Sequence, residues 1–249
     1  MKSQILMLLA FIISLSACKK DNAPVKADSQ EKTMLLRSAS DATTPENTAN
    51  AYDSIGYWHN QIVAYVENCK PVTETPDVEA STQCVLRFCR EMQWPEPSVS
   101  FFSTVEQTVN QSNESIENLI ANCPYEKPLK AALDSLAHLI KGLSDSDSPY
   151  PVIKAAIVDF ERTVMQDKQL TPEGRAIALK AASVARYSIY YWINTLQPPV
   201  PSAAFKFKNI VKWIAAVTSD IGGAIVSGSV EYAADCSTYA YDLVTYSMP

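Results

Sequence analysis

The stretch TPEGRAIALKAASVARYSIYYW, Thr171 to Trp192, contains the start and most of one long helix that is apolar on nearly every side. Thr171 is a good N-cap, and Pro172 suits the first helical position because its missing N–H would have no partner there. We predict a helix over 172–196. Because a helix that is apolar all round usually lies inside a protein, we expect this one at the centre of the fold.

Apolar residues at helical spacing predict further helices on both sides of this one. Before it we expect helices over 51–69, 78–93, from Ser98 or Ser100 to Cys123, 126–143 and 152–164, and after it one segment over 205–245. Asn50 and Asp77 are the expected N-caps of the first two, and Gly142 the expected end of the fourth. The sequence has no Asn-Gly or Asp-Gly hairpin turn. We therefore predict a single all-α, bundle-like domain of six to eight helices over 50–249, with a sub-boundary near 144–151.

The N-terminus has the features of a lipoprotein signal peptide. Lys2 is followed by an apolar run from Ile5 to Ile13 and then by Leu15-Ser16-Ala17-Cys18. The run is shorter than the roughly 20 apolar residues of a spanning helix, and the last four residues resemble a bacterial lipobox. We predict cleavage after residue 17 and acylation of Cys18, the alternative being a secretory peptide with a chance cysteine. This predicts a lipid anchor in the cell envelope, most simply in the outer membrane, on its periplasmic or its surface face.

The segment between Cys18 and the helical domain is polar and rich in Ala, Ser, Thr and Asn. It shows no apolar periodicity, so 18–49 is predicted to be a disordered tether. The 21 Lys and Arg residues include Lys2, so the processed chain keeps 20 basic against 27 acidic residues, a net charge of −7. Because nucleic acids select basic surfaces, we expect no nucleic-acid partner.

Five cysteines remain besides Cys18. An oxidising envelope permits disulfides, and we expect them among Cys69, Cys84, Cys89 and Cys123, although the sequence leaves the pairing open and buried free thiols are the alternative. Cys236 is expected to be a small apolar filler. With two histidines and no Cys-x-x-Cys pair, neither a metal site nor a cofactor is predicted.

The stretch Asn50 to Ile62 combines polar and aromatic residues with one glycine. On a helix, Asp53, Gly56 and Asn60 share a face, and His59 lies on the adjacent one. The glycine favours close packing of another helix, and a ligand held between Asp53 and Asn60 is the alternative. His59 has the chemistry of a general base, but no motif pairs it with a nucleophile, so no catalytic residue is predicted.

Arg186 interrupts an apolar helix and therefore needs a partner if it is buried. Asp53 and Asp159 are the expected partners in a structural ion pair, and a clamp for an anionic ligand is the alternative. Asp53, His59, Asn60 and Arg186 together are the candidate polar network or ligand site.

Small residues are frequent between Ile210 and Val230. Ala224 and Gly228, and likewise Gly223 and Ser227, have the four-residue spacing that lets helix backbones approach closely. A helix packed in the core is the expected outcome, and a membrane-active or self-associating tail is the alternative.

Three motifs suggest a family: Tyr52-Asp53-x-x-Gly56-x-x-His59-Asn60, Ala185-Arg186-Tyr187-Ser188-x-Tyr190-Tyr191-Trp192 and Asp220-Ile221-Gly222-Gly223-Ala224. Together with the lipobox they resemble uncharacterised helical lipoproteins of Bacteroidota. The resemblance implies a helical protein of unknown activity and transfers no catalytic residue. We expect a non-enzymatic interaction or ligand-binding module whose partner is a protein or a small molecule. The alternatives are a membrane-active or toxin-related factor acting through 205–245, and an enzyme in which Asp53, His59 and Arg186 converge.

Overall fold

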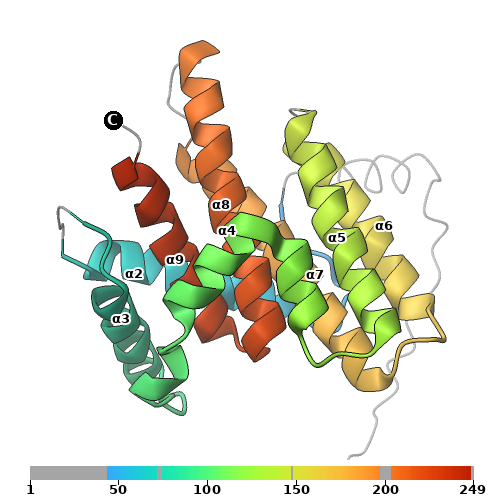
Figure 1. The fold of residues 1–249 in the computed structure, drawn as a ribbon, viewed down its shortest axis with the longest axis horizontal. Coiled ribbons are helices and arrows are strands. Elements are labelled where there is room, and N and C mark those ends of the chain that lie inside the picture. The colour runs from blue at the N-terminus through green and yellow to red at the C-terminus, as the bar shows by residue number, and fades with distance from the viewer. Residues whose placement is uncertain (1–43, 72–74, 147, 197–202, 248–249) are drawn as a thin grey trace, which may run out of the picture. The chain divides into compact units, whose positions relative to one another are not determined.

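The computed structural model describes residues 44–71, 75–146, 148–196 and 203–247 (Figure 1). In these ranges the chain forms eight α-helices and one short 3-10 helix, and it forms no strand, which confirms the predicted fold class. The elements are α2 (Asp53–Cys69), α3 (Val78–Glu91), η1 (Val99–Phe102), α4 (Val105–Asn122), α5 (Lys127–Asp145), α6 (Tyr150–Gln166), α7 (Pro172–Leu196), α8 (Ala203–Ser227) and α9 (Val230–Ser247). The predicted signal peptide, Cys18 and the tether up to residue 43 lie outside the described residues.

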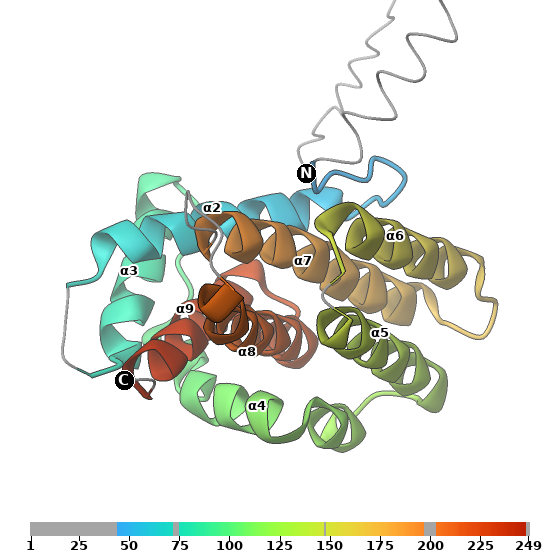
Figure 2. The same cartoon turned by 90° about the horizontal axis from the view of Figure 1, so that it is seen from above.

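Two helices, α7 and α8, form the centre of the domain. Helix α7 packs against α2, α5, α6 and α8, and α8 is surrounded by α4, α5, α7 and α9 (Figure 2). Small residues of α7, such as Ala181, Ala182 and Ala185, are fully buried, as are the larger Ile189 and Trp192. The predicted central helix therefore has this role, but it shares the centre with α8.

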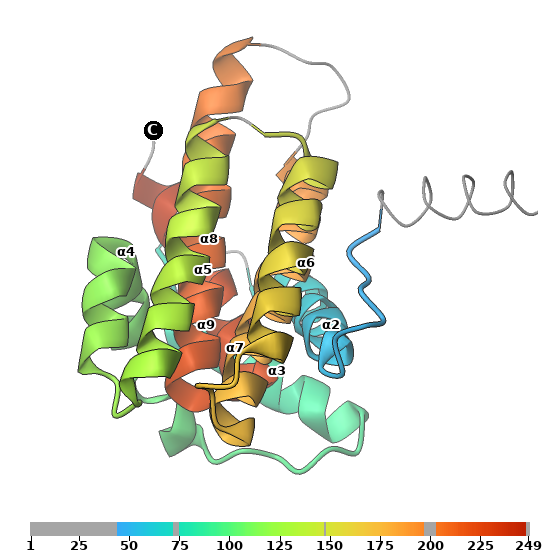
Figure 3. The same cartoon turned by 90° about the vertical axis from the view of Figure 1, so that its right-hand side faces the viewer.

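Helices α5 and α6 form a hairpin beside α7 (Figure 3). Each has an apolar stripe at the expected spacing of three and four residues, and the stripes are buried against the rest of the core. The stripes consist of Leu129, Leu133, Leu136 and Ile140 on α5, and of Ile153, Ile157 and Val164 on α6. The sub-boundary predicted near 144–151 thus falls in the short connection between the two helices of the hairpin.

Two of the predicted N-caps are confirmed and one is wrong. Asp77 accepts from the backbone N–H of Ala80 (3.0 Å), and the Thr171 hydroxyl accepts from that of Gly174 (3.0 Å), so both are N-caps. The N-cap prediction for Asn50 is wrong, because α2 begins at Asp53 and the Asn50 side-chain amide is buried elsewhere.

Three helix boundaries differ from the prediction. The segment expected over 205–245 is two helices, because Gly228 adopts a left-handed backbone (φ +65°) that ends α8. Gly142 does not end α5, which continues to Asp145. The helix expected from Ser98 or Ser100 starts as η1 and becomes α4 at Val105, with non-helical backbone at Ser115.

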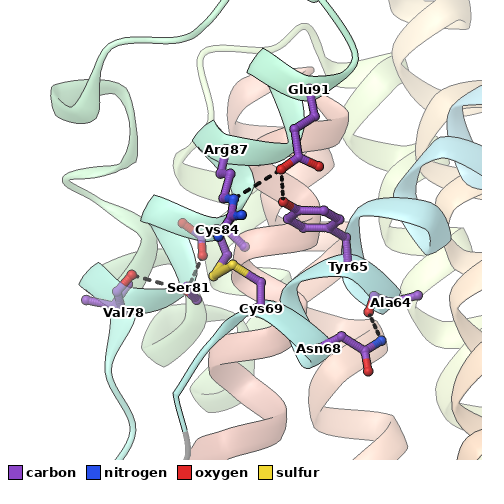
Figure 4. The surroundings of a disulfide bond; sticks show 10 residues. Ala64, Tyr65, Asn68, Cys69, Val78, Ser81, Cys84, Arg87 and Glu91 are labelled. Carbon is purple, nitrogen blue, oxygen red and sulfur yellow. Dashed lines mark hydrogen bonds and ion pairs between the residues drawn. A yellow bond between two sulfur atoms is a disulfide. The ribbon is translucent and has the colours of Figure 1, made fainter.

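A disulfide joins α2 to α3 (Figure 4). Cys69 is the last residue of α2 and Cys84 lies midway along α3, with Cα atoms 5.9 Å apart. The other described cysteines, Cys89, Cys123 and Cys236, are free thiols. Of the four cysteines expected to take part in disulfides, two do so, and the bond holds α3 against the end of α2.

Removing the disulfide is expected to destabilise the domain. The bond closes a loop of 15 residues, for which chain entropy predicts a loss of about 3 kcal/mol in the Cys69→Ser/Cys84→Ser variant. Urea unfolding followed by circular dichroism measures this loss. Dithiothreitol should destabilise the wild type by a similar amount and leave the double variant unchanged. Equal stability of wild type and variant would contradict the role given to the bond.

Candidate functional site

Helices α2 and α7 approach each other unusually closely at Gly56. A Cβ atom at this position would lie 2.5 Å from the backbone oxygen of Ser183 and 2.4 Å from the ring of Tyr187. The Gly56 N–H donates to the Ser183 hydroxyl (3.0 Å), which in turn donates to the backbone oxygen of Asp53 (3.0 Å). Glycine is thus required here by helix packing, and no space for a ligand lies between the two backbones at this point.

Arg186 lies beside this contact and is fully buried. Its Nη2 donates to Asp53 Oδ1 on α2 (2.7 Å) and to Glu161 Oε1 on α6 (3.0 Å). Burial lowers the pKa of Arg186, but the charges of Glu161 and Asp53 outweigh it and raise that pKa above its ordinary value. Asp53 was one of the two expected partners. The other, Asp159, is exposed and pairs with Arg162 instead.

Two asparagines before α2 complete this charge cluster. Asn47 donates through Nδ2 to Glu161 Oε2 (2.5 Å) and through its backbone N–H to Asp53 Oδ1 (3.1 Å). Asn50 donates to Glu161 Oε1 (2.7 Å), and the Tyr187 hydroxyl donates to Asp53 Oδ2 (3.1 Å). Both carboxylates are therefore surrounded by donors, and residues 47–50 are held against α6 by hydrogen bonds.

Glu161 was missed by the sequence analysis, although the sequence carries a signal for it. It follows Ile157 by four residues and precedes Val164 by three, so it lies on the apolar stripe of α6. A carboxylate at a core position of an amphipathic helix requires a buried cation or several donors.

His59 and Asn60 form a second buried cluster with α7 and α8. Asn60 Nδ2 donates to the backbone oxygen of Tyr187 (2.8 Å), so its amide oxygen faces His59 Nδ1 (3.1 Å). Nδ1 must then carry a proton. His59 Nε2 lies 3.2 Å from Asp220 Oδ1, and neither atom has a hydrogen-bond partner among the described residues. With the proton on Nδ1, both Nε2 and Asp220 Oδ1 are acceptors. Their contact is attractive only when either His59 Nε2 or the Asp220 carboxylate also carries a proton.

Asp220 is fully buried, and its second oxygen accepts from the Ser188 hydroxyl of α7. His59 therefore faces a carboxylate, and the Ser188 hydroxyl is bound to that carboxylate rather than to the imidazole. The arrangement is not that of a nucleophile activated by a base, in which the hydroxyl contacts the ring nitrogen.

A third buried carboxylate, Asp235 on α9, accepts from two hydroxyls of α3. Thr82 donates at 2.6 Å, and Ser81 donates to the other oxygen. Burial raises the pKa of Asp235 from 3.8 to about 7, against the lowering effect of the two hydroxyls and of Lys70. No sequence pattern singled out Asp235, because a lone Asp in a helix gives no sign of its burial.

The small residues of α8 serve close packing inside the domain. A Cβ atom at Gly223 would lie 2.8 Å from the Cα of Ala233 on α9. Across α8, a Cβ atom at Gly222 would meet the Ser112 hydroxyl of α4. The contact at Gly223 is of the kind that the spacing predicted. The pair of Ala224 and Gly228 is not used in this way, because Gly228 ends the helix and a Cβ atom there would meet nothing within 4 Å.

The polar residues predicted from the sequence thus fall into two clusters in the core rather than in one cleft. Asp53 and Arg186 lie together, whereas His59 and Asn60 contact Asp220 and the backbone of Tyr187. In the part of the chain that the structure describes, no group of three or more His, Cys, Asp and Glu side chains could hold a metal ion. A hollow of about 210 Å³ on α4, lined by residues such as Gln111, Ser115 and Asn118, contains none of the predicted site residues.

Replacing Arg186 by Met is expected to destabilise the domain by about 3–5 kcal/mol, because it leaves Glu161 buried without a cation. Adding Glu161→Gln removes that charge, so the double variant should recover part of the loss. Urea unfolding of the two single variants and the double variant measures the coupling. If the double variant is no more stable than Arg186→Met, the unpaired charge is not the cause.

The raised pKa of Asp235 should make the stability of the domain depend on pH. Its folded pKa of about 7 exceeds the ordinary value of 3.8, so the folded state binds the proton more tightly than the unfolded state. This stabilisation is complete below about pH 4 and is lost as the pH rises towards 7. The free energy of unfolding of Asp235→Asn, measured relative to wild type, should therefore increase by a few kcal/mol over that range. Glu114→Gln, at an exposed position, is the control and should show no such trend.

No protein-family model, curated protein or solved structure matches this chain. The resemblance to helical lipoproteins of Bacteroidota therefore stays a prediction.

Proposed function

We propose that this chain is a lipid-anchored protein of the cell envelope whose helical domain is a non-catalytic module that binds a protein or a small ligand. The observation that carries the proposal is the burial of Arg186 and His59, each in contact with a carboxylate from another helix. The side chains best suited to chemistry thus take part in helix packing. We therefore expect the domain to bind its partner through its surface.

A catalytic role for these residues has no support in their surroundings. Arg186, Glu161, His59 and Asp220 are all fully buried, so a substrate would have to displace a helix to reach them. General acid–base catalysis requires the catalytic group to come within hydrogen-bond reach of the substrate.

Two features support the envelope location. The sequence Leu15-Ser16-Ala17-Cys18 after a short apolar run is typical of an acylated cysteine. The disulfide between Cys69 and Cys84 suits an oxidising compartment, because thiols are kept reduced in the cytosol.

The alternative, a membrane-active segment over 205–245, has less support. Gly222, Gly223 and Asp220 are in contact with α4, α9 and α2, so α8 would have to leave the core before these residues could meet lipid. Among the described helices, none combines the length and the apolar character needed to cross a bilayer.

If Cys18 is acylated, a Cys18→Ser variant should lose both its lipid and its attachment to the membrane. In cells fed an alkyne fatty acid, the wild type should carry the label and sediment with membranes, whereas the variant should carry no label and become extractable without detergent. Cys123→Ser is the control and should behave as wild type. Labelling of the Cys18→Ser variant would contradict acylation at this residue. Protease treatment of intact cells then shows which face of the membrane carries the domain.

A further inference from the structure

Five aromatic rings form a continuous row along α2 and α3, which we call the aromatic strip. In order, they are Tyr57, Trp58, Trp94, Phe88 and Tyr65. Neighbouring rings meet edge to face with centroids 5.2, 4.9, 5.7 and 5.3 Å apart. Contacts of this kind are favourable, so the rings support one another as a single surface element.

One side of the strip faces solvent. Tyr57 is 46% exposed and Met92, in the turn after α3, is 40% exposed, while Trp58, Trp94 and Tyr65 are half-buried. Single exposed apolar side chains are ordinary on protein surfaces, but adjoining ones mark interaction sites. The strip is such a group, and the exposed Met92 lies two residues before its member Trp94.

The turn that carries Met92 and Trp94 has a fixed conformation. The Trp94 N–H donates to the Cys89 backbone oxygen (2.9 Å), and the Gln93 N–H donates to that of Arg90 (3.1 Å). This is a Schellman motif, in which glycine usually takes the left-handed position. Here Gln93 takes it (φ 57°), a conformation that is unfavourable for a residue with a Cβ atom. The strained turn holds Trp94, the middle ring of the strip, two residues after the exposed Met92.

We propose that the aromatic strip and Met92 dock on the surface of the bilayer to which Cys18 is attached; this rests on the lipid anchoring proposed above. Trp and Tyr have an apolar ring with a polar group at one end, so they favour the boundary between lipid and water. Met92, two residues before Trp94, adds a flexible and 40% exposed apolar side chain. Contact through these groups needs no basic patch, which is consistent with the acidic net charge of the chain.

Chain length places the bilayer within reach of the strip. Thr44, the first described residue, follows Cys18 by 26 positions, and a fully extended chain spans at most about 3.6 Å per residue. An acylated Cys18 would therefore keep Thr44 within roughly 90 Å of the lipid surface. At that separation even a weak affinity of the strip for lipid leads to frequent contact, because the second interaction becomes intramolecular.

The test uses the processed chain from residue 18 with Cys18→Ser, because an acyl chain or the signal peptide would bind lipid without the strip. It is mixed with vesicles of phosphatidylethanolamine and phosphatidylglycerol, and binding is measured by co-flotation. Tyr57→Asp/Met92→Asp should lower the partition coefficient about tenfold, because a charge disfavours entry into the interface. Val152→Asp, at a 50% exposed position on α6, is the matched control and should bind as wild type.

Thermal unfolding checks that each variant is folded, and Met92→Asp alone replaces the double variant if that one is not. Binding should persist at high salt, since apolar contacts are not screened. Absence of flotation by the unsubstituted chain, or an equal decrease in the Val152→Asp control, overturns the proposal. Because this chain is not acylated, such a failure is distinct from a failure of lipidation, which the fatty-acid label at Cys18 reports. A strip that contacts another protein instead would leave the tryptophan fluorescence of the chain unquenched by brominated lipid, which also overturns the proposal.

Discussion

The contact on which much of the domain depends is the buried Arg186 guanidinium between the carboxylates of Asp53 and Glu161. A cation without water needs anions at short range, and here they come from two different helices. Rotation or sliding of α2 or α6 along α7 would separate a charge from its partner. The ion pairs therefore determine the register of three helices. Gly56 makes this geometry accessible, because any larger residue would hold α2 away from α7.

The same constraint recurs at two more places in the core. Asp220 lies against His59 of α2 and accepts from Ser188 of α7, and Asp235 on α9 accepts from Ser81 and Thr82 of α3. Apolar packing alone would tolerate small changes of helix position, whereas each of these carboxylates has donors at fixed places. Buried polar groups thus specify the arrangement of the helices, and they do so with side chains that resemble catalytic ones in type. The types of these residues alone would suggest catalysis. The groups that they contact belong to neighbouring helices, so in this structure the residues join helices to one another.

The sequence predicted the parts of this structure that depend on local patterns. The caps at Asp77 and Thr171 and the stripes of α5 and α6 follow from rules that act within a few residues, and they are found. The partner Glu161 and the burial of Asp235 depend on which helices meet in space, so no local rule could reveal them. Asn50 shows how contacts with distant helices override a local preference. It is a good N-cap by type, but two acceptors on α6 and α7 bind its amide nitrogen.

These observations bear on where the domain can recognise a partner. Most polar atoms of the buried clusters around Arg186, Asp220 and Asp235 have partners within the protein, although Nε and Nη1 of Arg186 have none among the described residues. Opening these clusters would require the separation of ion pairs or hydrogen bonds. Surface groups have no such constraint. The aromatic strip differs from the core clusters because its rings contact one another and still leave Tyr57 and Met92 to solvent. A rigid interior of this kind can hold an exposed apolar surface in place. Here the disulfide fixes α3 near its middle, and the Schellman turn fixes its C-terminal end. Binding at this edge would require little reorganisation of the fold, which favours the surface over the core as the place of function.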